Sequence, residues 1–132
     1  MPALKKLILP TTLKEIGYNA ISGCPNLEEI ILPEGLETIR SSAFSYNSGL
    51  TEITIPKSVR HICSNVFAGC ESLEKIIFEG DAPDNIWCSD DPSDSEYYHY
   101  FMEKDHYTIY YHKGAGGFTS PTWYDYPIQE IE

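Results

Sequence analysis

Basic residues are scarce in this sequence, which holds 9 Lys and Arg against 20 Asp and Glu and has a formal net charge of −11 at pH 7. Proteins bind nucleic acids and anionic membranes largely through Lys and Arg, which neutralise the phosphate groups. A chain with so few cations is poorly suited to either partner. We therefore expect no nucleic acid partner and no attraction to an anionic membrane.

Long apolar runs are also missing, since no stretch approaches the roughly 18 residues that a transmembrane helix needs. We accordingly predict no membrane insertion. The start of the chain does not look like a signal peptide, because Met1 leads almost directly into the first repeat position, Leu4, without a basic start and an apolar stretch. Two explanations fit: the protein is cytoplasmic, or the sequence is the C-terminal part of a longer exported chain.

Motifs of catalysis and of cofactor binding are absent as well. No nucleophile is paired with a base at a familiar spacing, so we predict that the protein is not an enzyme. The glycines of Gly114–Gly117 do not form a dinucleotide-binding loop, because Pro121 opposes the helix that would have to follow. The histidines and Cys88 match no zinc-binding pattern. We therefore predict no cofactor.

The acidic stretch 89–96 is the one candidate cation site. Its carboxylates are the kind of ligand that calcium prefers, but their spacing is not that of an EF-hand loop and the central glycine is missing. The residues concerned are Asp90, Asp91, Asp94 and Glu96. The simpler interpretation is a solvated acidic loop, so we predict no metal site.

What the sequence does contain is a repeat with a constant period of 23 residues. The copies open at Leu4, Leu27, Leu50 and Leu73. Behind each leucine, apolar residues return at fixed positions, which in the third copy are Ile53, Ile55, Val59, Ile62, Val66 and Phe67. A fixed period with apolar residues locked to columns is typical of a solenoid, in which stacked copies bury a core that no single copy can bury alone.

The columns follow the pattern L-x-x-I-x-[IL]-P-x-x-[LV]-x-x-I-x-x-x-[AV]-[FI]-x-x-[CN], which resembles the BspA-like leucine-rich repeat, a bacterial type common in surface proteins. The resemblance covers residues 1–79, as repeats 4–26, 27–49 and 50–72 and a partial repeat 73–79. It implies a non-enzymatic protein-binding or adhesion module that is extracellular or at the cell surface. It also favours the longer exported chain over the cytoplasmic alternative.

The predicted fold is a leucine-rich repeat solenoid, mostly β. From the leucine to the proline of each repeat, apolar and polar residues alternate, as in a strand with one inward and one outward face. We expect short parallel strands at Lys6–Leu9, Glu29–Leu32, Glu52–Ile55 and Lys75–Phe78. We expect a second extended stretch at Lys14–Ile16, Glu37–Ile39 and Arg60–Ile62, and a single helical or 3₁₀ turn at Asn19–Ser22, Ser42–Ser45 and Asn65–Ala68.

The outward positions of the first strands form a file of mostly apolar residues with charged neighbours. The file is Ile8, Ile31, Thr54 and Ile77, and the neighbours include Glu29, Glu52 and Lys75. A strand spacing of about 4.8 Å makes this file a short, straight track. An apolar stripe with charged flanks is typical of a contact surface, so we predict that these residues bind a protein partner. β-branched residues also suit any exposed strand, and that simpler interpretation stays open.

Residues 80–132 differ from the repeats in composition. They carry a net charge of −9, against −2 for residues 1–79, and twelve of the seventeen aromatic residues. We predict a C-terminal capping region with an acidic insert, in which Tyr107–His112 adds an edge strand and Thr119–Ile128 covers the open end of the stack. Exposed tail aromatics also suit sugar rings. A carbohydrate-binding module is therefore the alternative function, with Trp123 and Tyr124 as secondary candidate residues.

Four cysteines raise the question of disulfides. Cys24 and Cys70 occupy one column two repeats apart, which separates them by roughly 10 Å, whereas a disulfide needs Cα atoms within about 7 Å. We interpret both as buried thiols. Cys63 takes a column otherwise filled by glycine and arginine, so we expect it to be partly exposed. A bridge between Cys63 and Cys88 stays open as the less favoured alternative.

The N-terminal edge of the stack has no polar cap in the sequence. Uncovered strand edges pair readily with other chains. We therefore predict self-association through residues 1–21, or further repeats upstream in the natural protein.

Overall fold

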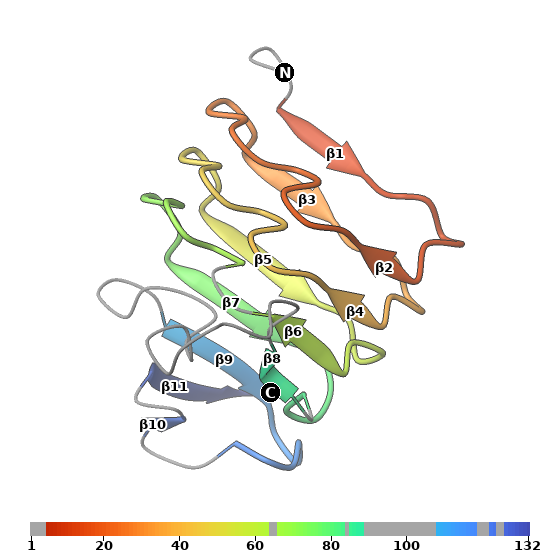
Figure 1. Cartoon of the computed structure of the whole chain (residues 1–132). Coiled ribbons are helices and arrows are strands. Elements are labelled where there is room, and N and C mark those ends of the chain that lie inside the picture. Colours follow the sequence, from red (N-terminus) through yellow and green to blue (C-terminus); the bar gives the residue numbers. More distant parts are fainter. Residues whose placement is uncertain (1–4, 64–65, 84, 89–107, 119–121, 124–125) are drawn as a thin grey trace.

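A computed structural model describes residues 5–63, 66–83, 85–88, 108–118, 122–123 and 126–132. In this part the chain winds into a solenoid, in which each repeat places one strand in a front ladder and one in a back ladder (Figure 1). Equivalent strands of successive repeats run parallel. The predicted solenoid of stacked short strands is confirmed.

The front ladder collects the first strand of each repeat and three strands of the tail. Its members are β1 (Lys6–Ile8), β3 (Glu29–Ile31), β5 (Glu52–Ile55), β7 (Lys75–Phe78), β9 (Thr108–His112), β11 (Tyr126–Ile131) and β10 (Thr122–Trp123). The back ladder is β2 (Glu15–Ile16), β4 (Thr38–Ile39), β6 (His61–Cys63) and β8 (Asn85–Cys88). Within the repeats, each strand lies within one residue of the bounds expected from the sequence.

Proline ends the first strand of the first three repeats, because it has no N–H for the ladder. Its carbonyl oxygen then accepts a hydrogen bond from the amide three residues later. These bonds measure 3.1 to 3.2 Å and join Pro10 to Leu13, Pro33 to Leu36 and Pro56 to Val59. The repeated turn carries the chain from the front ladder to the back ladder.

The segments expected to be helical turns are hydrogen-bonded turns, and the described residues contain no helix. The Ala20 amide donates to the Gly17 carbonyl at 3.3 Å, as in a 3₁₀ turn. Asn19 and Ser42, however, have φ values of 51° and 59°. That left-handed conformation interrupts a right-handed helix. Consequently, no helix in this part of the chain is long and apolar enough to cross a membrane.

The core lies between the two ladders and is built from repeated columns. Leu27, Leu50 and Leu73 are fully buried, and Phe44 and Phe67 stack with ring centroids 5.8 Å apart. Only one neighbouring repeat covers the first layer, so its leucines are only half-buried. These are Leu7, Leu9 and Leu13.

The prediction that Cys63 is partly exposed is wrong, because its side chain is fully buried. Strand β8 extends the back ladder beside β6 and places Cys88 opposite Cys63. The earlier repeats have glycine and arginine at this position, and their exposure does not predict that an extra strand covers Cys63. Cys63 takes part in no disulfide, so the alternative bridge is not formed. Cys24 and Cys70 are also buried and outside any disulfide, as predicted.

The strand expected at Tyr107–His112 forms as β9, but it is not an edge strand. It lies between β7 and β11, with Ile109 opposite Ile76 on one side and Ile128 on the other. Phe118 packs beside it, 4.9 Å from the Tyr111 ring. The tail therefore lengthens the front ladder. The boundary between residues 79 and 80 stays a prediction, and residues 89–107 and 119–121 lie outside the described part.

Candidate binding surface

The outward file occupies the front face as the alternation predicts. Ile8 and Ile31 are opposite each other in the pair β1–β3, and Thr54 and Ile77 are opposite each other in β5–β7. Ile8 is 65% exposed and Ile31 39% exposed. Ile77 is only half-exposed, and Tyr110 of β9 is its partner on the other side.

Tyr110 is a residue of this face that the repeat pattern did not find. It lies in line with Ile77, and the Lys75 ammonium group lies 5.7 Å from the centre of its ring. The signal was available in the alternation of Tyr107–His112, because the buried Ile109 requires its neighbours to point outward. The file therefore extends beyond the four repeats into the tail.

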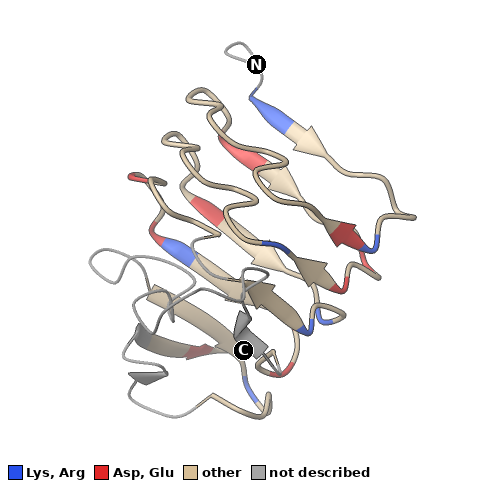
Figure 2. Ribbon diagram, in the orientation of Figure 1, with Lys and Arg blue, Asp and Glu red and all other residues tan. Residues whose placement is uncertain are grey.

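A row of charges crosses the front face where the strands begin (Figure 2). It consists of Lys6, Glu29, Glu52 and Lys75, one at the start of each strand. Lys6 lies 3.8 Å from the Glu29 carboxylate, and both side chains are more than half exposed. Glu52 is opposite Lys75 in the ladder but forms no ion pair with it. Among the described residues, Glu52 therefore has no ion-pair partner.

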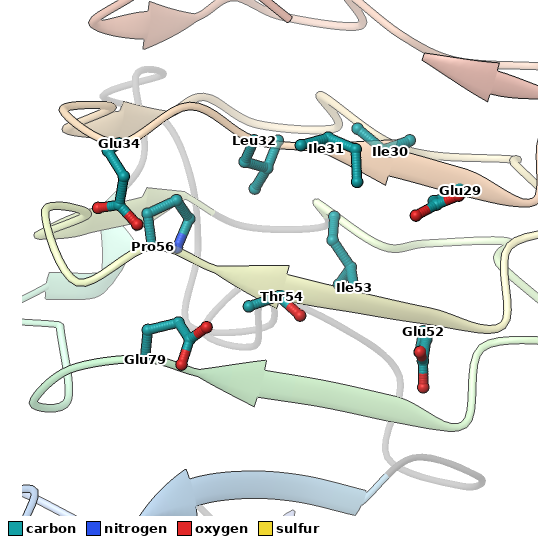
Figure 3. A pocket seen from close by; sticks show the side chains of 10 residues that line it. All are labelled: Glu29, Ile30, Ile31, Leu32, Glu34, Glu52, Ile53, Thr54, Pro56 and Glu79. Carbon is teal, nitrogen blue, oxygen red and sulfur yellow. The ribbon is translucent and has the colours of Figure 1, made fainter. Parts of the chain in front are cut away.

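A groove of about 220 Å³ opens on this face between β3 and β5 (Figure 3). Its middle is lined by Ile31, Leu32, Thr54 and Pro56. Carboxylates lie at both ends: Glu29 and Glu52 at the start of the strands, and Glu34 and Glu79 beyond their ends. Four residues of the predicted contact surface line the groove, namely Glu29, Ile31, Glu52 and Thr54. Ile8, Ile77 and Lys75 lie on the same face outside it.

Sequence reasoning missed Glu34 and Glu79 as parts of this site. Glu79 stands where the earlier repeats have proline, and Glu34 directly follows Pro33. The replacement of proline by Glu79 was visible in the sequence. The groove that both carboxylates line was not.

The groove exists because the front ladder is interrupted. Strands β1 and β3 form one sheet, and a second sheet consists of β5, β7, β9, β11 and β10. No ladder hydrogen bond joins β3 to β5 in the described chain. In a parallel ladder, alternate residues point their N–H and C=O groups to the same side. The Lys75 amide donates to the Thr51 carbonyl, so the main-chain groups of Thr51 point towards β7. The main-chain N–H and C=O groups of Glu52 and Thr54 point instead towards β3.

Behind the groove the same two repeats remain joined. Strands β4 and β6 pair through Thr38 opposite His61 and Ile39 opposite Ile62. The Ser58 hydroxyl donates to the Leu36 carbonyl at 2.7 Å. The opening is therefore a wedge, closed at the back ladder and open at the front, with main-chain polar groups on its floor.

The family model for the BspA type leucine rich repeat region (6 copies) matches residues 1–84. The chain belongs to the BspA-type leucine-rich repeat family. No curated protein and no solved structure matches the chain significantly. Repeats of this family generally bind proteins and act as non-enzymatic scaffolds, and they are typically surface-associated in bacteria.

In this BspA-type chain, one end of the groove is tied to the tail. The Glu79 carboxylate lies 2.6 Å from His112 Nε2, and His112 Nδ1 lies 3.0 Å from the main-chain oxygen of Glu132. Both partners are acceptors, so both ring nitrogens donate when the imidazole is protonated. The Glu132 oxygen and the Glu79 carboxylate therefore raise the pKa of His112 above its ordinary value of 6.5.

The tail candidates remain predictions. Trp123 lies in the short strand β10, whose side chains are not described, and Tyr124 lies outside the described residues. The acidic stretch 89–96 also lies outside them. Among the residues that are described, no group of three or more His, Cys, Asp or Glu side chains is arranged to hold a metal ion.

Proposed function

We propose that this protein is a protein-binding module that holds its partner on the front face. The residues concerned are Ile8, Ile31, Thr54, Ile77, Glu29, Glu52 and Lys75. The observation that carries the proposal is the groove between β3 and β5, because a hollow open to solvent falls on the file that the sequence alternation singles out. The setting that the family suggests is adhesion in a bacterial surface protein.

The size of the face indicates weak binding by a single copy of the array. Four strands of about four residues, spaced by about 4.8 Å, present roughly 250 Å². A stable protein interface buries about 800 Å² on each partner. An extended segment suits this small area, and longer arrays gain strength by engaging several segments together.

Selection of phage-displayed random peptides on the immobilised chain tests the proposal. We expect the selected peptides to bind the wild type and to lose at least about tenfold in affinity for the variant Ile31→Asp/Ile77→Asp. Both positions are on the front face, so the new carboxylates stay hydrated in the folded protein. Circular dichroism of the variant checks that it folds.

The matched control is Thr12→Asp/His61→Asp, which adds the same charge at exposed positions away from the front face. Its affinity for the selected peptides should equal that of the wild type. Peptides that bind both variants equally well would place the contact surface elsewhere and contradict the proposal.

A further inference from the structure

The groove between β3 and β5 is too small for most small-molecule ligands. Its volume is about 220 Å³, whereas pockets for drug-sized ligands span about 300 to 1,000 Å³. It has the dimensions to accept individual side chains of a segment that lies along it. The size therefore favours a polypeptide over a free metabolite.

The charges of the groove have one sign. All its ionisable residues are glutamates, and they stand at both ends of an apolar middle (Figure 3). Glu29 is near Lys6, and Glu79 contacts His112. Glu34 and Glu52 have no ion-pair partner among the described residues. A cation bound at each end of the groove would give these carboxylates a partner of opposite charge. The apolar middle suits uncharged residues between the two cations.

The floor of the wedge adds hydrogen-bonding groups that need partners. Ile30 on β3 and Thr54 on β5 direct main-chain groups into the gap where the ladder bonds are missing. A guanidinium has five donors in a planar fork and pairs with carboxylates in a bidentate manner. A lysine ammonium is a more compact and more strongly hydrated charge. Arginine is therefore the better match for carboxylates and carbonyls held together.

The separation of the carboxylates sets the spacing of the arginines. Glu29 and Glu34 lie five positions apart along β3 and the residues that follow it. Side chains of an extended segment alternate between its two faces, so two arginines can both face the groove only if an even number of steps separates them. Four steps cover about 13 Å at about 3.3 Å per residue, and the long arginine side chains bridge the rest of the roughly 16 Å between the carboxylates. Two arginines with three residues between them therefore reach both ends of the groove.

We propose that the groove between β3 and β5 binds an extended polypeptide segment with two arginines separated by three small or apolar residues. One arginine pairs with Glu29 and Glu52, and the other with Glu34 and Glu79. The intervening residues lie on Ile31 and Thr54. This inference rests on the proposed front-face binding and names the chemistry of its partner.

Fluorescence anisotropy with labelled five-residue peptides tests the inference. The probe is RTVTR, and its matched controls are RRTVT, which has the same composition and charge, and KTVTK and ETVTE. We expect RTVTR to bind at least about tenfold more tightly than RRTVT and ETVTE, because only its spacing places an arginine at both pairs of carboxylates. KTVTK should bind more weakly than RTVTR.

Two variants of equal charge assign the effect to the groove. Glu34→Gln/Glu52→Gln should weaken RTVTR binding by about tenfold. Glu37→Gln/Glu71→Gln removes two exposed carboxylates that do not line the groove, and it should leave the affinity unchanged. Circular dichroism verifies that both variants fold.

Absence of saturable RTVTR binding, equal binding of RRTVT, or equal weakening by both variants would overturn the inference. The random-peptide selection then separates the two proposals. If selected peptides lack paired arginines but depend on Ile31 and Ile77, the front-face function stands and the arginine specificity is wrong. If no peptide depends on either set of residues, both proposals are wrong.

Discussion

Ile30 and Ile31 are chemically identical neighbours with opposite surroundings. Ile30 is 4% exposed and belongs to the core, whereas Ile31 is 39% exposed and lines the groove. The difference follows from the strand geometry, since successive side chains point to opposite faces. The proline after each of the first three copies also fixes where the alternation stops. At the scale of single residues, position in the repeat therefore decides role more strongly than residue type.

The variants Leu50→Ala and Thr54→Ala test this division within one repeat. Leu50 is fully buried between two neighbouring repeats, so its truncation should cost about 2 to 5 kcal/mol of unfolding free energy. Thr54 is exposed on the front face, so its truncation should change that free energy by no more than about 0.5 kcal/mol. Urea denaturation monitored by circular dichroism measures both. Comparable losses for the two variants would mean that the inward and outward assignments are wrong.

The buried cysteines show where residue-level prediction ends. Burial raises the pKa of the Cys70 thiol to about 11, and its Sγ lies 3.1 Å from the Phe44 carbonyl oxygen. The column position was enough to predict this environment. For Cys63 it was not, because the strand that pairs with β6 comes from the tail and follows no repeat pattern.

At the scale of elements, His112 connects the ends of three strands. It belongs to β9, and its ring contacts Glu79 after β7 and Glu132 after β11. Because its pKa is raised in the folded protein, protonated His112 stabilises the fold below its ordinary pKa. That contribution is lost as the pH rises through the raised folded-state pKa.

We therefore expect wild-type stability to exceed that of His112→Gln by more at about pH 6 than at about pH 8. Comparing the two proteins at each pH cancels the titration of groups that they share. Urea denaturation at both pH values provides the measurement. A difference that stays constant, or that grows towards high pH, would exclude this role of His112.

Strand β1 is the other element whose position carries a prediction. Within the described part of the chain it pairs only with β3. The hydrogen bonds of Lys5 and Leu9 with β3 direct the N–H of Ile8 away from that strand. Its outer edge is therefore available to a second copy of the chain, which is the basis of the predicted self-association.

Proline at position 8 removes this outward N–H without removing a bond to β3. We expect the wild type to show concentration-dependent association in analytical ultracentrifugation and Ile8→Pro to remain monomeric. Ile8→Val keeps the N–H and should associate like the wild type. A wild type that stays monomeric throughout, or an Ile8→Pro variant that associates equally, would contradict pairing through β1.

At the scale of the whole molecule, the period of 23 residues was sufficient to predict the solenoid. It places Leu27, Leu50 and Leu73 in one column, and the structure buries all three. The strands follow from the same columns, and so does the outward direction of Ile8 and Ile31. These features repeat in the sequence, so each copy supports the interpretation of the next.

The groove was not predictable because it is a difference between copies. The front ladder is interrupted between β3 and β5, yet both strands follow the same pattern of residues as their neighbours. The tail was hard to predict for a related reason. Strands β9 and β11 join the front ladder without the leucine and proline columns that mark a repeat.

Both proposals for the front face depend on this interruption, and amide hydrogen exchange followed by NMR tests it most directly. Ile31, Thr54 and Ile77 hold equivalent positions, each with its N–H directed towards the preceding strand of the ladder. We predict that the amides of Ile31 and Ile77 exchange slowly and that of Thr54 exchanges fast, because only Thr54 lacks a ladder acceptor. Equal protection of all three amides would show that the ladder is continuous between β3 and β5, and would contradict the account of the groove.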